Sequence, residues 1–161
     1  MELRTVRAED REAVIALVDA VYREYGDRVC LERADKDLAD LPGSYAEGAF
    51  VVLDDAGSVR GSAAVLPAPD LPRVCVLRRF YLPAELRGAG WGRRLLKWTL
   101  DWAVRRGVER VELWSDTRFT RGHAFYERHG FRRGGMREMD DGWTPYREHF
   151  FSLELRAAGS M

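Results

Sequence analysis

Arg87-Gly88-Ala89-Gly90-Trp91-Gly92 is the segment that decides the fold, and it stands between a strand-like run, Cys75–Leu82, and a long helical pattern. Its three glycines within five residues carry no Cβ atom, so a bulky anion can come close to their backbone N–H groups. A helix that begins near Gly90 would direct its unpaired amides and the positive end of its dipole toward the same point. Strand, glycine turn and helix start together predict a phosphate-binding turn.

Basic side chains gather near this turn, although the chain as a whole is neutral, with 26 basic and 26 acidic residues. A neutral balance argues against a dedicated nucleic-acid-binding protein, which usually carries a basic excess or patch. The local cluster forms either a solvated face or a set of phosphate contacts, and its place beside the turn favours phosphate. Its members are Arg78, Arg79, Arg87, Arg93, Arg94 and Lys97.

Two nucleotide-binding motifs with glycine-rich turns do not fit this segment. A dinucleotide fingerprint needs a third glycine, and Leu95 occupies that position. The fingerprint also opens the first strand–helix unit of a domain, whereas several strand-like runs precede this turn. A P-loop needs Gly-Lys followed by Ser or Thr, and no such sequence follows.

The patterns on either side of the turn predict a mixed α/β (α+β) fold. From Gly90 to Arg106, apolar residues at helical spacing form a wide stripe, and Gly107 follows as a helix stop. The order β-α-α-β-β-β-α-β-α-β-β is expected, which gives a mixed sheet with helices on both faces. The other helices are expected over 10–26, 31–41 and 120–129, and the clearest strands over 2–7, 49–53, 60–66, 74–82, 108–115 and 148–155.

The length of 161 residues predicts one domain, 1–157, followed by a short C-terminal tail, 158–161. The chain has no apolar stretch of about 18 residues and no signal-peptide pattern, so we expect a cytoplasmic protein with no membrane partner. Cys30 and Cys75 lack metal-site or redox spacing and are expected to be reduced thiols. The three histidines form no compact ligand pattern, so no metal is expected.

Two sequence blocks resemble the GNAT N-acetyltransferase superfamily. The first is Leu82–Leu96, where Arg87, Gly90 and Gly92 match the acetyl-CoA signature Gln/Arg-x-x-Gly-x-Gly/Ala. The second is Phe125-Tyr126-Glu127-Arg128-His129-Gly130-Phe131, which is similar to the family's Tyr-Glu-Lys-x-Gly-Phe. The blocks come in the family's order with one helix and one strand between them, which is far more specific than either block alone.

The resemblance implies a central mixed, mostly antiparallel sheet of about six to seven strands, flanked by about four helices. It also implies that strands 75–82 and 110–116 are parallel neighbours that splay apart. The V-shaped gap between them would receive the pantetheine arm of acetyl-CoA.

By the same resemblance, the amides of residues 88–92, together with Arg87, hold the CoA pyrophosphate. Phe80 and Leu82 would flank the thioester, and a backbone N–H near Phe80–Leu82 would stabilise the oxyanion, a donor typically worth roughly 3–4 kcal/mol. The expected acetyl-CoA-binding residues are Phe80, Tyr81, Leu82, Arg87, Gly88, Ala89, Gly90, Trp91, Gly92, Arg93 and Lys97.

The resemblance makes Tyr126 the expected general acid, which would protonate the departing CoA thiolate. Its alternative role is aromatic packing with a hydroxyl hydrogen bond. The general base is open, because this chain has Val76 and Phe119 where many relatives carry Glu and Asn. The candidates are Glu112, Asp116 and His123, each of which could instead be structural, and deprotonation relayed by water also stays open.

The acceptor pocket is expected between the N-terminal helices and the last hairpin. Acidic residues there would attract a cationic amine, and aromatic rings would contact it through cation–π interactions. The expected acceptor-binding residues are Tyr25, Asp37, Tyr45 and Trp143, with Asp40 and Tyr146 as further candidates.

These features together predict transfer of an acetyl group from acetyl-CoA to an amine by direct attack, through a tetrahedral intermediate. A small-molecule amine is preferred over a protein acceptor because the loops are short. We expect a monomer or homodimer with no nucleic-acid partner. Two alternatives stay open: an acyl-CoA-binding sensor or regulatory module without turnover, and a protein lysine or N-terminal acetyltransferase.

Overall fold

The computed structural model describes residues 1–140, 143 and 145–155, so the predicted tail 158–161 lies outside the described residues. The order of its helices and strands is the order expected from the sequence. The elements are β1 (Glu2–Thr5), α1 (Arg11–Arg23), α2 (Lys36–Ala39), β2 (Ala49–Asp55), β3 (Ser58–Pro67), β4 (Val74–Tyr81), α3 (Trp91–Arg105), β5 (Arg110–Asp116), α4 (Thr120–Arg128), β6 (Arg132–Asp140) and β7 (Pro145–Glu154). Short 3₁₀ turns at Ala8–Asp10, Gly43–Tyr45 and Ala84–Leu86 join some of them.

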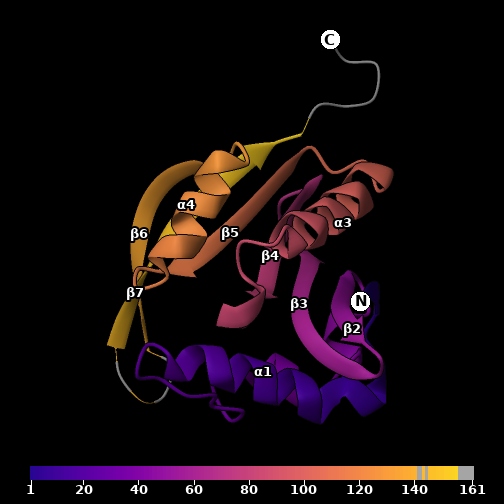
Figure 1. The fold of residues 1–161 in the computed structure, drawn as a ribbon. Helices are drawn as coiled ribbons and strands as arrows, with labels where there is room; N and C mark the ends of the chain where they lie inside the picture. Colours follow the sequence, from indigo (N-terminus) through magenta and orange to yellow (C-terminus); the bar gives the residue numbers. More distant parts are fainter. Residues whose placement is uncertain (141–142, 144, 156–161) are drawn as a thin grey trace.

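One sheet contains all seven of these strands, in the order β1-β2-β3-β4-β5-β7-β6 (Figure 1). Every neighbouring pair is antiparallel except β4 and β5, which run parallel and are joined through α3. The predicted mixed, mostly antiparallel sheet with a parallel pair at its centre is therefore confirmed.

Strand β2 shows how the sheet builds a core on each face. Its side chains alternate, so Phe50 and Val52 pack with α1 and α2, while Val51 packs with Leu95 of α3 on the opposite face. Val51 and Val52 are both fully buried, and each such side chain contributes about 1.5–3 kcal/mol. Helices therefore cover both faces, as expected.

The segment 31–41, expected to be one helix, is instead a set of turns followed by the single-turn α2. The Asp35 carboxylate accepts a hydrogen bond from the backbone N–H of Cys30 at 2.8 Å, and the Asp35 N–H donates to the Cys30 carbonyl at 3.0 Å. These bonds close a turn and compete with helical hydrogen bonds, which makes the predicted helix wrong over its first half.

The parallel pair β4–β5 separates soon after it forms. Only Val74–Val76 pair with Arg110–Glu112, and the strands then diverge. This confirms the expected splay. Backbone N–H groups of β4 that face β5 beyond Val76 lack the strand partner they would have in a continuous ladder, so a ligand can take that place.

A β-bulge at Arg79 accompanies the divergence. Ser62 pairs with Tyr81 but Ala64 pairs with Arg78, so two residues of β4 oppose one residue of β3. Arg79 has a φ of 54°, in the left-handed region that a long side chain rarely adopts. The Ser62 hydroxyl donates to the Arg79 carbonyl at 2.7 Å and fixes the bulged peptide.

The Arg79 side chain anchors this bulge to the N-terminal helical region. It is only 5% exposed, and it donates to Asp37 at 2.6 and 2.9 Å and to Asp35 at 2.9 Å. Tyr22 of α1 accepts a further bond at 3.0 Å. Arg79 was among the basic residues expected to contact phosphate, and this expectation is wrong because its guanidinium is buried between two carboxylates.

Replacing Asp37 by Asn should lower the free energy of unfolding by roughly 3 kcal/mol, because buried Arg79 would keep its charge and lose its two-pronged partner. Urea unfolding followed by circular dichroism measures this change. The matched control is Asp101→Asn, because the Asp101 carboxylate pairs with Lys97 on the exposed face of α3. This replacement should lower the free energy of unfolding by less than about 0.5 kcal/mol. Equal stabilities for the two variants would show that the Asp37–Arg79 pair does not stabilise the bulge.

Candidate active site

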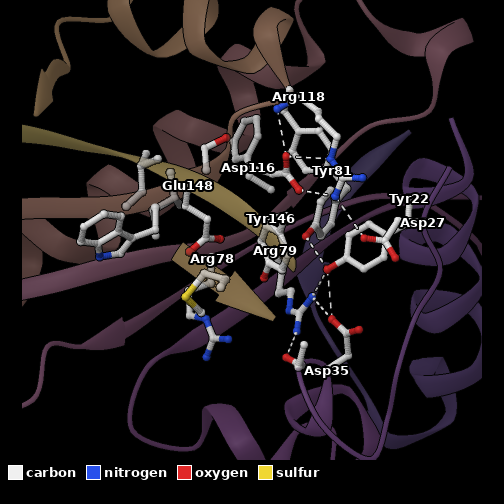
Figure 2. A pocket seen from close by; sticks show the side chains of 18 of the residues that line it. Tyr22, Asp27, Asp35, Arg78, Arg79, Tyr81, Asp116, Arg118, Tyr146 and Glu148 are labelled. Carbon is white, nitrogen blue, oxygen red and sulfur yellow. Dashed lines mark hydrogen bonds and ion pairs between the residues drawn. The ribbon is translucent and has the colours of Figure 1, made fainter. Parts of the chain in front are cut away.

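A cavity of about 260 Å³ opens where β4 and β5 diverge (Figure 2). Strand β4 lines it from Val76 to Tyr81, and β5 lines it from Leu113 to Asp116. Helix α1, the turns that follow it, α4 and the β6–β7 hairpin complete the wall. The cavity therefore begins at the residue where the parallel pairing ends.

Aromatic side chains dominate the apolar part of this wall. Phe80 is part of it and packs against Phe125 and Tyr126, with ring centroids 5.5 and 6.0 Å apart. Small-molecule sites typically combine such apolar surface with a few placed polar groups. The aromatic lining residues are Tyr22, Phe80, Tyr81, Trp114, Phe119, Tyr126 and Tyr146.

The charged groups of the wall form ion pairs with one another. Arg118 donates to Asp116 at 2.6 Å and to Asp27 at 3.1 Å, which ties β5 to the segment after α1. Arg137 of β6 donates to Glu148 of β7 at 2.8 Å. These partners hold the two ends of the cavity, and Figure 2 shows Arg118 and Glu148 on separate sides of it.

Tyr126, the expected general acid, lies in the wall of the cavity. It is 7% exposed, and its hydroxyl makes no hydrogen bond with any residue that the structure describes. Burial raises the pKa of Tyr126 above its ordinary value, and nearby Tyr81 adds to the effect. The side chain therefore stays protonated at neutral pH and keeps a proton to donate.

The structure places one of the three base candidates in the cavity wall. Asp116 lines the cavity, whereas Glu112 pairs with Arg110 at 2.9 Å and stands outside the lining. His123 is buried behind the wall, and its Nε2–H donates to the Asp116 carbonyl at 2.9 Å. Burial lowers the pKa of His123, so it is neutral at physiological pH.

The glycine turn has the backbone conformation expected of a phosphate-binding turn. Gly88 and Gly90 have φ values of 81° and 89°, and both are exposed. Gly90 is the N-cap of α3, and no side chain caps the helix there. The first amides of α3 are therefore open to an anion.

Arg87 has protein partners that the sequence did not indicate. It forms a two-pronged ion pair with Glu24, at the end of α1, with distances of 2.7 and 2.8 Å. Its Nε–H also donates to the Leu82 carbonyl at 3.1 Å. Arg87 therefore fixes the turn between α1 and the end of β4, and a contact with phosphate would require an exchange of partners.

The remaining residues expected at the cofactor site lie along the start of α3. Arg93 is exposed, Lys97 pairs with Asp101, and the guanidinium of Arg94 stacks over the Trp91 ring at 4.7 Å. Gly92 packs beside Phe125, since a Cβ there would come within 3.3 Å of the Phe125 ring, and Phe125 in turn packs on Phe80 of the cavity wall. Of the residues expected to bind acetyl-CoA, Phe80 and Tyr81 line the cavity and the others stand outside its lining.

The four expected acceptor-binding residues stand outside the cavity lining. Tyr25 packs against Phe119 with ring centroids 4.6 Å apart, and the Trp143 ring lies 3.5 Å from the Arg28 guanidinium. Tyr45 is 3% exposed and donates to Asp37, which also pairs with Arg79 and, at 4.0 Å, with Arg78. Of the two further candidates, Tyr146 lines the cavity and Asp40 does not.

The sequence did not single out several residues of the wall, among them Tyr22, Asp35, Arg118 and Glu148. The available signal was the dipeptide Arg78-Arg79 inside an otherwise apolar strand, because a charged residue in a buried strand needs a partner of opposite charge. Those partners come from segments far away in the sequence.

No described helix is long and apolar enough to cross a membrane. In the same part of the chain, no group of three or more His, Cys, Asp or Glu side chains could hold a metal ion.

Solved structures resemble this fold along nearly its whole length. A GNAT-family acetyltransferase from Staphylococcus aureus Mu50 has a TM-score of 0.82 at 14% identity, with 96% of this chain and 99% of that chain covered. An acetyltransferase from Streptococcus agalactiae 2603 has a TM-score of 0.81 at 20% identity, covering 96% and 98%. The ribosomal-protein-alanine N-acetyltransferase from Brucella melitensis has a TM-score of 0.72 at 20% identity, covering 96% and 100%.

The sequence itself matches the acetyltransferase (GNAT) family model over residues 14–131. No curated protein matches it. The matched range runs from α1 through the glycine turn to the end of the Tyr126 block, and so includes both sequence blocks and the splayed strands. The chain therefore belongs to the GNAT acetyltransferase family.

Proposed function

We propose that this protein is an acetyl-CoA-dependent N-acetyltransferase. The observation that carries the proposal is the gap between β4 and β5, which contains a cavity lined by aromatic and charged side chains, together with the exposed glycine turn that follows β4 at the start of α3. Acetyl-CoA is the typical acyl donor of the family to which the chain belongs. One end of the gap suits a pyrophosphate and the other suits a thioester.

The glycine turn would hold the pyrophosphate through the amides of residues 88–92. The left-handed glycines and the uncapped start of α3 support this role. Arg87 is a further phosphate contact if it leaves Glu24 when acetyl-CoA binds. Arg93 is exposed on the same first turn of the helix and needs no such exchange.

The reaction would be a direct attack of the acceptor amine on the thioester carbonyl. An N–C bond forms to give a tetrahedral intermediate, and the C–S bond then breaks to release CoA thiolate. A backbone N–H of β4 near Phe80–Leu82 would stabilise the oxyanion, because the strand has left its β5 partner there. Tyr126 would protonate the thiolate, since it lines the cavity and carries an uncommitted proton.

The acceptor must also lose a proton, because an alkylamine arrives mostly as ammonium at neutral pH. Asp116 is the base candidate that lines the cavity, although its carboxylate accepts hydrogen bonds from Arg118. We propose that Asp116 takes the proton either directly or through water. Glu112 and His123 are less suited, because they stand outside the lining.

A small-molecule amine suits the cavity better than a protein. Its volume of about 260 Å³ is just below the usual range for drug-sized ligands, and aromatic side chains enclose it. A protein N-terminus is the second candidate acceptor, because one of the similar structures is that of a ribosomal-protein-alanine N-acetyltransferase. A protein acceptor would need to insert only its terminal residue.

Release of free CoA thiol tests the proposal most simply. Purified protein is mixed with acetyl-CoA and a panel of amines, and thiol is detected with a chromogenic disulfide. Amine-dependent release supports the transferase. Binding of acetyl-CoA by calorimetry without release for any amine would contradict it and favour the sensor alternative.

Replacing Tyr126 by Phe should lower kcat by roughly 10²-fold or more, because the leaving thiolate would lose its proton donor. Steady-state thiol release with an accepted amine measures this effect. Acetyl-CoA affinity, measured by calorimetry, is the control and should stay unchanged. An unaltered kcat would reduce Tyr126 to a packing residue.

Replacing Gly90 by Glu should abolish acetyl-CoA binding, because a carboxylate and a strained backbone would stand where the pyrophosphate is expected. The matched control is Gly107→Glu, since Gly107 also has a positive φ of 73° and open space but lies at the far end of α3. Calorimetry should detect binding to the control alone. Equal binding by both variants would contradict the proposed pyrophosphate site.

A further inference from the structure

Arg78 is a cation of the cavity wall whose hydrogen-bond donors are unused. It lines the cavity, and its side chain is 37% exposed. Its ion pair with Asp37 is 4.0 Å long, and that carboxylate oxygen already accepts from Arg79 at 2.6 Å. Arg78 makes no hydrogen bond with any residue in the described part of the chain. A guanidinium has five N–H donors and no acceptor, so it has capacity for an anion.

The other three arginines of the wall differ from Arg78 in this respect. Arg79, Arg118 and Arg137 each donate to a carboxylate at 3.0 Å or less. Of the acidic residues in the wall, Asp27, Asp35, Asp116 and Glu148 are paired with these arginines, and Asp140 also has an interaction partner. Among the described lining residues, Arg78 is therefore the charged group whose hydrogen-bond donors are available to an incoming molecule.

Arg78 also lies close to the expected reaction centre. It immediately precedes the bulge, and Phe80, expected beside the thioester, is two residues further along β4. Two residues of a fully extended strand span about 7 Å, which is the upper limit across the bulge at Arg79. Figure 2 shows the Arg78 side chain among those that line the cavity. An anionic group bound to Arg78 would therefore belong to the acceptor amine, at a short distance from its nitrogen.

Resting on the proposed N-acetyltransferase function, we propose that the acceptor is a small amine that also carries a carboxylate, an amino acid with an apolar or aromatic side chain. Arg78 binds the carboxylate with its two parallel N–H donors, a geometry that guanidinium and carboxylate share. The aromatic wall formed by Tyr22, Trp114 and Tyr146 receives the side chain. The carboxylate is unchanged by the reaction and serves only to orient the amine.

Pairs of acceptors that differ only in the carboxylate show how much this group contributes to the reaction. L-Phenylalanine, L-tyrosine, L-tryptophan, L-methionine and L-leucine are each compared with their primary amides in the thiol-release assay. The amides have the more easily deprotonated amine, so intrinsic reactivity favours them. We expect the opposite order for at least one pair, with kcat/KM at least about 10-fold higher for the free amino acid, as one charge-assisted bidentate contact allows.

The variant Arg78→Gln should lower kcat/KM for the preferred amino acid by about 10- to 100-fold and leave the matched amide nearly unchanged. Arg78→Lys keeps the charge without the planar fork and should recover part of the loss. Arg105→Gln, an exposed arginine near the end of α3, removes the same charge away from the cavity and should alter neither substrate. A purely structural role for Arg78 would instead lower kcat/KM equally for acid and amide.

Each outcome of these assays supports or overturns the carboxylate site, the transferase function, or both. Turnover of amines without preference for the acid, or equal losses in Arg78→Gln, overturns the carboxylate site and leaves the transferase standing. If no amine releases thiol, the transferase fails, and the carboxylate site is then decided by calorimetry on the CoA-saturated protein. N-Acetyl-L-methionine should bind at least about 10-fold more tightly than N-acetyl-L-methioninamide, and this difference should vanish in Arg78→Gln. Equal binding would overturn the site.

Discussion

The buried ion pairs of Arg79 with Asp35 and Asp37 are the interaction on which the site depends. A β-bulge needs a residue in an unusual conformation, and here that residue is an arginine with a positive φ. The two carboxylates hold its guanidinium in the N-terminal helical region, so the strand cannot relax into a regular ladder without breaking them. The same network that fixes the bulge therefore also fixes the part of β4 that lines the cavity.

The bulge and the splay have one consequence for chemistry. Strand β4 turns away from β5 after Val76, and its inner edge then faces a cavity instead of a neighbouring strand. Aromatic rings and charged side chains share the lining of this partly open space, and ion pairs hold most of its charges. Polar groups that have no hydrogen-bond partner within the described residues can bind a ligand there with less competition from water than on an open surface. Tyr126 and Arg78 are of this kind.

The sequence predicted most accurately the features that a local sequence pattern determines. The apolar stripe of α3 and the glycine on each side of it placed this helix to within about a residue, and the two family blocks placed Tyr126 in the wall. The predictions were wrong for residues whose interaction partners lie far away in the sequence. The helix expected over 31–41 is absent before Lys36, where the Asp35 carboxylate bonds to the Cys30 N–H and to Arg79, 44 positions later in the chain. For the same reason Tyr45 and Asp37 were expected beside the acceptor, although they pack and pair around Arg79.

The most direct test is a crystal structure of the protein with acetyl-CoA bound. We predict the pyrophosphate against the amides of residues 88–92 and the thioester between β4 and β5, beyond Val76. The thioester carbonyl should accept a hydrogen bond from a β4 backbone N–H near Phe80–Leu82, with Tyr126 facing the sulfur. Acetyl-CoA bound elsewhere, or a closed β4–β5 ladder with no ligand between the strands, would contradict this site.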